Sequence, residues 1–243
     1  MTGAAFTIPY MIPTQDRRKH TLQPGYTSKQ VTINELGFRG DMPSGNVVVC
    51  LGDSVPFGCG VADAKTYPHY LSALNAGVPS YNMRQCLDRF RLDVLEHVPL
   101  EKIKAVTLQS ANDVSLLTQW GGMWDPDVTW GQGHPSTPPS FYPPNYMLAH
   151  MKKTLEGLIE LLSGIPLILL PVDPNYRDSE FAFYLDMWGE MFEAQNVLLQ
   201  KLSGQSDVYY LDIRGKKHID FFHYAPKTNR TIADTLRDFI DSL

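Results

Sequence analysis

The fold class of this chain is decided by the stretch VVVCLGDS, Val47 to Ser54. Five apolar residues that end abruptly at a glycine predict a buried strand followed by a sharp turn. Because open α/β sheets bind ligands at the carboxyl ends of their strands, Ser54 is expected at such an edge. It would also begin the next helix, where free N–H groups stabilise developing negative charge. Ser54 is therefore a candidate nucleophile, and an ordinary helix N-cap is the alternative interpretation.

Apolar segments of two kinds alternate along the 243 residues. Short apolar runs predict strands at Val47–Leu51, Ala73–Val78, Lys104–Gln109, Pro166–Pro171 and Val208–Leu211. Longer segments predict helices at Lys65–Leu71, Arg84–Glu96, Asn145–Leu162, Ser179–Leu202 and Thr231–Leu243. This alternation predicts an α/β fold with a parallel sheet covered on both faces. The length suits one such domain.

Two segments depart from this alternation. Residues 1–40 are polar and irregular, and they predict an N-terminal arm, with a short strand at Gln30–Ile33, that packs on a domain of residues 41–243. Residues 117–146 form an insertion with six prolines and three tryptophans, Trp120, Trp124 and Trp130. A loop this long is usually functional, and its aromatic content argues against disorder. It is interpreted either as a lid or wall that contacts substrate, or as a small core over the sheet.

A second polar cluster lies near the end of the chain, where Asp220 precedes His223 by three residues. A serine hydroxyl becomes a good nucleophile when a histidine takes its proton and a carboxylate orients that histidine. Asn112 follows the predicted strand Lys104–Gln109 and would place an amide donor at the same sheet edge. The alternatives are a surface histidine and an ordinary turn asparagine.

In this order, these segments resemble the conserved blocks of the SGNH hydrolases, also called the GDSL-like esterase and acyltransferase superfamily. The blocks are Gly52-Asp53-Ser54, Ser110-Ala111-Asn112-Asp113 and Asp220 to His223, and the lead-in Asn34 to Gly40 resembles that of bacterial members. The resemblance spans residues 34–243. It implies a flavodoxin-like three-layer α/β/α sandwich with five parallel strands, and a catalytic triad of Ser54, His223 and Asp220.

The resemblance also implies an oxyanion hole built from the backbone N–H groups of Ser54 and Ser80 and the side-chain amide of Asn112. Ser80 stands where the family has a glycine, in the stretch Asn75 to Tyr81. The N–H survives this change, but a Cβ is strained if the position needs a positive φ. Asp53 and Asp113 are expected to brace the turns around them.

The activity implied is hydrolysis of small or carbohydrate O-acyl esters, in particular O-acetyl esters, through an acyl-enzyme and without a cofactor. Trp120, Trp124 and Trp130 are candidate substrate-binding residues. An O-acyltransferase with the same triad and a non-catalytic binding module of the same fold are the alternatives. The sequence does not indicate the oligomeric state.

Composition limits the partners and the compartment. A net charge of −5 argues against a nucleic-acid or anionic-membrane partner, and the short cationic run Arg17 to His20 is predicted to be a solvated surface turn. The seven histidines lack metal-ligand spacing, so no metal site is expected. No apolar run is long enough to span a membrane. Three cysteines and no signal peptide predict a cytoplasmic protein, and a secreted chain whose leader has been removed is the alternative.

Overall fold

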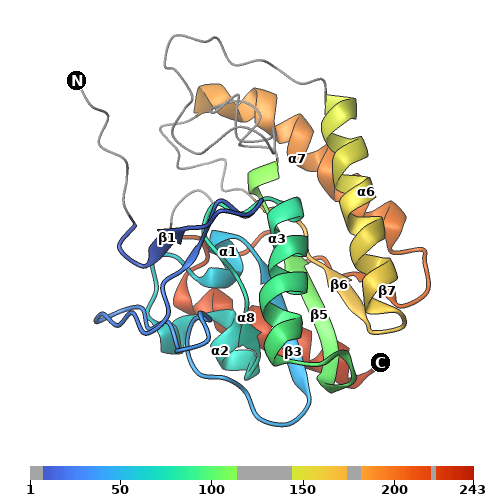
Figure 1. The fold of residues 1–243 in the computed structure, drawn as a ribbon. Helices are drawn as coiled ribbons and strands as arrows, with labels where there is room; N and C mark the ends of the chain where they lie inside the picture. The colour runs from blue at the N-terminus through green and yellow to red at the C-terminus, as the bar shows by residue number, and fades with distance from the viewer. Residues whose placement is uncertain (1–7, 114–143, 174–181, 220–222) are drawn as a thin grey trace.

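A five-stranded parallel sheet lies between two layers of helices (Figure 1). The computed structural model describes residues 8–113, 144–173, 182–219 and 223–243. The strands run in the spatial order β4-β3-β5-β6-β7 and each neighbouring pair is parallel. They are β3 (Val47–Gly52), β4 (Leu74–Asn75), β5 (Ile103–Gln109), β6 (Leu167–Leu169) and β7 (Val208–Tyr210). The predicted α/β sandwich with a flavodoxin-like strand order is confirmed.

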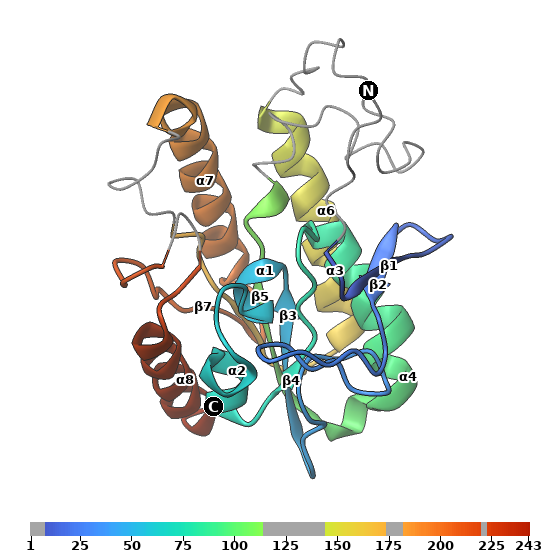
Figure 2. The same cartoon turned by 90° about the vertical axis from the view of Figure 1, so that its left-hand side faces the viewer.

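The helices divide between the two faces of the sheet (Figure 2). One face is covered by α3 (Met83–Arg89), α6 (Pro144–Leu162) and α7 (Ala182–Leu202), and the other by α2 (Tyr67–Leu71) and α8 (Pro226–Asp241). The described residues also include shorter helical segments: α1 (Ser54–Phe57), α4 (Leu95–His97), the 3₁₀ turns η1 (Asp63–Lys65) and η3 (Leu100–Lys102), and a π-helical turn η2 (Phe90–Val94). No helix among the described residues is long and apolar enough to cross a bilayer.

Strand side chains alternate between the two faces, as the strand period of two requires. Val49 and Leu51 of β3 belong to the larger apolar cluster, with side chains from α3, α6 and α7. Cys50, between them, belongs to the smaller cluster under α2 and α8. Burial on both faces explains why β3 is an unbroken apolar run in the sequence.

Several element boundaries differ from the prediction. Only Leu74–Asn75 of the predicted strand Ala73–Val78 pairs as β4, although the N–H groups of Ala76 and Val78 still donate to carbonyls of β3. The last helix begins at Pro226 rather than Thr231, because a proline in the first helical turn loses no internal hydrogen bond. The helix predicted at Arg84–Glu96 is interrupted by the π turn.

The N-terminal arm contains a hairpin that the sequence analysis did not predict. Strands β1 (Met11–Pro13) and β2 (His20–Leu22) pair antiparallel, and the run Arg17 to His20 closes their turn. The strand expected at Gln30–Ile33 is reduced to isolated bridges, Thr27 with Thr32 and Ile33 with Arg39. The arm also contributes to the core, since Leu22, Ile33 and Phe38 are buried in the larger apolar cluster.

Candidate active site

Ser54 lies at the carboxyl end of β3, as the first residue of α1. Asp53 caps this helix, because its Oδ1 accepts a hydrogen bond of 2.9 Å from the N–H of Val55. The turn before it requires glycine, since a Cβ on Gly52 would lie 1.9 Å from the carbonyl oxygen of Gln109 on the neighbouring strand. Ser54 itself is half-buried. It lies between the ends of β3 and β5, at the topological switch point where the strand order reverses and where open α/β sheets bind ligands.

His223 reaches Ser54 from the other end of the chain. The Nε2 atom of His223 lies 2.8 Å from Ser54 Oγ. The loop that holds His223 is closed by backbone hydrogen bonds from Ile219 N–H to the His223 carbonyl (2.7 Å) and from Ala225 N–H to the Lys217 carbonyl (3.1 Å). The structure therefore brings together the predicted nucleophile and the predicted base. Asp220, the third predicted triad residue, lies outside the described residues, as do Trp120, Trp124 and Trp130.

The carboxylate of Asp53 organises the turn after β5. Its Oδ2 accepts from the backbone N–H of Ala111 (2.6 Å) and from Asn112 Nδ2 (3.1 Å). Asn112 Nδ2 also donates to the carbonyl of Tyr81 at 3.2 Å. A substrate oxygen would therefore share the hydrogens of this amide with protein acceptors. Asp53 is fully buried, and burial raises its pKa to about 6 against the opposing effect of its N–H donors.

Ser80 has a φ of +67°, in the left-handed region that the sequence analysis identified as the risk at this position. A non-glycine residue in this region costs about 1 kcal/mol. Within the described part of the chain, no group accepts a hydrogen bond from the backbone N–H of Ser80 or of Ser54. Both N–H groups are therefore available to an external acceptor, which is what an oxyanion hole requires.

Asp113, the second buried carboxylate, holds the turn after β5 against α3. It accepts hydrogen bonds from the N–H of Met83 (2.9 Å to Oδ2) and from Ser110 Oγ (2.8 Å). Burial, with a smaller contribution from the nearby Asp53 carboxylate, raises the pKa of Asp113 to about 7. The bracing roles expected for Asp53 and Asp113 match these contacts.

Residues 17–19 of the run predicted as a solvated turn do form a turn, and Arg17 is exposed, but the end of the run is not solvated. His20 is buried, and Arg18 pairs with Asp16 and with Asp93 of η2. The contact with Asp93 has no sequence signal, because Asp93 lies on a helical segment 75 positions away with no fixed spacing to the run. Gln195 of α7 was also missed; it is fully buried and its Nε2 donates to the Ser110 carbonyl at 2.7 Å.

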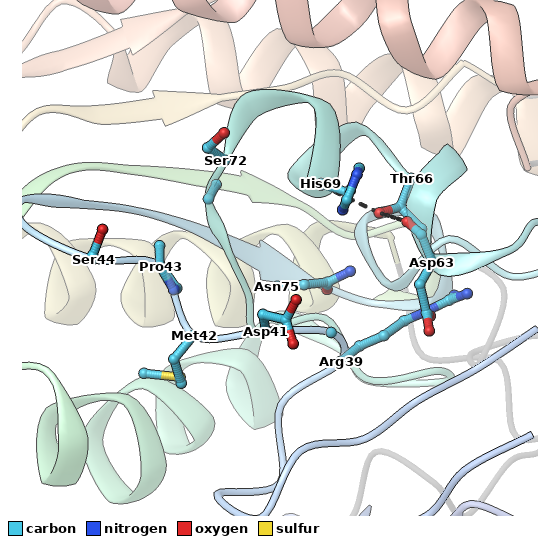
Figure 3. Close-up of a pocket in the computed structure, with 12 residues that line it drawn as sticks. Arg39, Asp41, Met42, Pro43, Ser44, Asp63, Thr66, His69, Ser72 and Asn75 are labelled. Carbon is cyan, nitrogen blue, oxygen red and sulfur yellow. Dashed lines mark hydrogen bonds and ion pairs between the residues drawn. The ribbon is translucent and has the colours of Figure 1, made fainter.

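A cavity of about 340 Å³ lies away from this site, between the loop of residues 40–44 and α2 (Figure 3). Neither Ser54 nor His223 lines it. Its buried polar residues already bond within the chain: Arg39 donates to Asp63 Oδ1 at 2.7 Å, and Asn75 Nδ2 donates to the Phe57 carbonyl at 3.2 Å. Among the described residues, no group of three or more His, Cys, Asp or Glu is placed to hold a metal ion.

No protein-family model and no curated protein sequence matches the chain. Solved structures do match its fold. A lipase/acylhydrolase from Enterococcus faecalis superposes with a TM-score of 0.57 at 16% identity, over 81% of this chain and 96% of that one. A GDSL-like lipase from Bacteroides thetaiotaomicron superposes with a TM-score of 0.55 at 15% identity, over 84% of this chain and 92% of the lipase. A carbohydrate acetylesterase from Sinorhizobium meliloti superposes with a TM-score of 0.55 at 12% identity, over 81% of this chain and 99% of the esterase. The chain therefore has the three-layer fold of the SGNH hydrolases, the superfamily that its sequence motifs resemble.

Proposed function

We propose that this protein is a serine esterase that hydrolyses small or carbohydrate O-acyl esters through an acyl-enzyme. The observation that carries the proposal is the 2.8 Å contact between His223 Nε2 and Ser54 Oγ. These residues are 169 positions apart in the chain, and they meet at the sheet edge where open α/β folds bind ligands. A hydroxyl within hydrogen-bond distance of an imidazole is the arrangement that activates serine.

The first step requires a particular tautomer of His223. With its proton on Nδ1, the imidazole accepts the Ser54 proton at Nε2 while Oγ forms a bond to the ester carbonyl carbon. Asp220, three residues earlier, is the candidate carboxylate that holds Nδ1–H and stabilises the imidazolium. The ester C–O bond then breaks, His223 gives its proton to the leaving alcohol, and the acyl group stays on Ser54. Water, deprotonated by His223, releases the acid.

The oxyanion of each tetrahedral intermediate would be stabilised by the N–H groups of Ser54 and Ser80, with Asn112 Nδ2 as a third donor. The absence of protein acceptors for the two N–H groups among the described residues supports this assignment. An oxyanion-hole donor typically contributes about 10²–10³-fold to the rate.

The substrate class is supported by the chemistry of the matching proteins and by the insertion. One matching structure is a carbohydrate acetylesterase and another an acetylxylan esterase, which shares 16% identity with this chain. Tryptophan rings stack on sugar faces, so we propose that Trp120, Trp124 and Trp130 contact the carbohydrate.

The test is hydrolysis of p-nitrophenyl acetate, butyrate and octanoate by wild type and Ser54→Ala. We expect turnover that favours the short esters and falls at least about 10³-fold in Ser54→Ala. Ser206→Ala, at an exposed serine before β7, is the matched control and should retain full activity. A fluorophosphonate, from which Oγ displaces fluoride, should label wild type and Ser206→Ala but not Ser54→Ala.

These results separate the esterase from the non-catalytic binding module and test the role of Ser54. Ser54-dependent labelling with ester turnover supports the esterase. An unlabelled wild type would indicate the non-catalytic binding module, and activity retained in Ser54→Ala would remove Ser54 as the nucleophile.

A further inference from the structure

The N-terminal arm contacts the turn that carries Ser80 through a buried histidine. His20, the first residue of β2, is 6% exposed, and its Nε2 lies 3.0 Å from the carbonyl oxygen of Pro79. A carbonyl oxygen can only accept a hydrogen bond, so Nε2 carries the proton and donates it. Burial lowers the pKa of His20, which favours the neutral ring with its proton on this nitrogen.

The Pro79 carbonyl belongs to the same peptide unit as the Ser80 N–H. A trans peptide is planar, so its C=O and N–H bonds point in opposite directions. Any rotation of this peptide moves both bonds together. A hydrogen bond that fixes the carbonyl on the arm side therefore fixes the direction of the Ser80 N–H on the opposite side.

This peptide needs such a constraint because of the residue that follows it. Ser80 is held at a φ of +67°, which its Cβ disfavours. The Ser80 N–H makes no hydrogen bond within the described part of the chain that could hold it in place. Strained backbone persists where surrounding contacts over-determine it, and His20 supplies one of those contacts from outside the turn.

The arm is itself held where it contacts the turn. Tyr81 Oη donates to the His20 carbonyl at 2.5 Å, and the two rings pack edge to face with centroids 5.0 Å apart. Gln85 Nε2 donates to the Arg18 carbonyl at 2.7 Å. The backbone carbonyl of Tyr81 also accepts from Asn112 Nδ2. One buried cluster thus joins the arm to two of the three candidate oxyanion donors.

We propose that His20 is a positioning residue, which holds the Pro79–Ser80 peptide so that the Ser80 N–H points at the oxyanion. This inference rests on the proposed esterase function. It assigns the arm, which lies largely before the segment that resembles the SGNH hydrolases, a role in stabilising the transition state.

The experiment compares His20→Leu, which removes the donor at similar volume, with His20→Gln, which keeps an N–H donor. We expect His20→Leu to lower kcat on p-nitrophenyl acetate about 10- to 100-fold, with KM within about threefold. The affinity for an aryl trifluoromethyl ketone should fall by a similar factor, because Ser54 Oγ adds to it and the resulting oxyanion occupies the hole. His20→Gln should restore most of both. Arg17→Met, at an exposed side chain in the same turn of the arm, is the matched control and should keep both kcat and the affinity for the ketone.

Three outcomes would overturn the inference: a kcat of His20→Leu within threefold of an active wild type, a fall in kcat without weaker ketone binding, or an equal loss of kcat in Arg17→Met. Amide exchange at Ser80, followed by NMR in the unliganded protein, separates this inference from the proposed function. A wild type as inactive as Ser54→Ala refutes the function. An unchanged Ser80 amide resonance and exchange rate in His20→Leu refutes the positioning role whatever the activity.

Discussion

The backbone at Ser80 combines a left-handed conformation with an N–H that no described group accepts. The first property favours glycine, and the second is independent of the side chain, because every non-proline residue carries the N–H. Serine at this position therefore affects the energy of the turn more than the chemistry that the turn can perform.

Replacing Ser80 with glycine tests this separation. We expect Ser80→Gly to keep kcat/KM within about threefold, because the donor remains. The unfolding free energy should change by less than about 1 kcal/mol, because two effects oppose each other. Glycine relieves the strain of the positive φ in the folded state, and it also increases the conformational entropy of the unfolded chain. Steady-state kinetics and urea denaturation measure the two effects. A tenfold fall in kcat would instead give the Ser80 hydroxyl a role of its own.

The residues that sequence could identify are those that follow a strand end or have a fixed spacing. Ser54 and Asn112 each follow a predicted strand, and parallel strands bring their carboxyl ends to one edge. His223 was indicated by its spacing from Asp220, and its contact with Ser54 fits that indication, while the catalytic roles of both residues stay predictions. His20 carries no such signal, because its contact with Pro79 joins residues 59 positions apart through a hairpin that was not predicted.

At the scale of elements, the core strands were predictable because burial on both faces makes them uniformly apolar. The hairpin β1–β2 was not, since its three-residue strands carry no alternation long enough to recognise. The start of α8 was missed because Pro226 was not recognised as a residue of the first helical turn. Tertiary contacts fix the hairpin, whereas the start of α8 has a local signal in Pro226.

Asp113 links two elements, the end of β5 and the start of α3, and makes their contact sensitive to pH. An acid whose folded pKa is raised from 3.8 to about 7 binds its proton more tightly when folded. This contribution to stability is fully present below pH 3.8 and is lost as the pH rises through about 7. Asp53, raised to about 6, contributes with the same sign.

Asp113→Asn removes one of these two titrations while keeping a polar side chain of the same shape. We expect the unfolding free energy of wild type to fall relative to that of Asp113→Asn, by on the order of 3 kcal/mol between pH 4 and pH 8. Urea denaturation across that range measures it. Asp234→Asn, at an exposed carboxylate on α8, should show no such trend. A wild type that gains stability relative to Asp113→Asn over this range would contradict the raised pKa.

On the scale of the whole molecule, the arm is part of the same core as the sheet. Phe38 is fully buried, and the guanidinium of Arg89 from α3 lies 4.5 Å from the centre of its ring. The next residue, Arg39, donates to the carbonyls of Phe57 and Gly58 at 2.7 and 2.8 Å, at the end of the helix that Ser54 begins. If the arm detached, the buried carbonyl oxygens that accept from Arg39 would lose their hydrogen-bond donor, which is costly. We therefore expect the arm and the sheet to unfold together.

Phe38→Ala tests this cooperativity, with Leu36→Ala as its matched control two residues earlier at a side chain 40% exposed. Loss of a fully buried phenylalanine should lower the unfolding free energy by about 3–5 kcal/mol, and the exposed leucine by less than about 0.5 kcal/mol. Far-UV circular dichroism should show one transition in both. In hydrogen exchange, the protection free energy of the β3 and β5 amides should fall by as much as the global unfolding free energy, because a shared core opens as one unit. If the strands keep their full protection in Phe38→Ala, the arm is a separate appendage, and its contacts with the Ser80 turn would be too weakly coupled to the sheet to hold that turn in place.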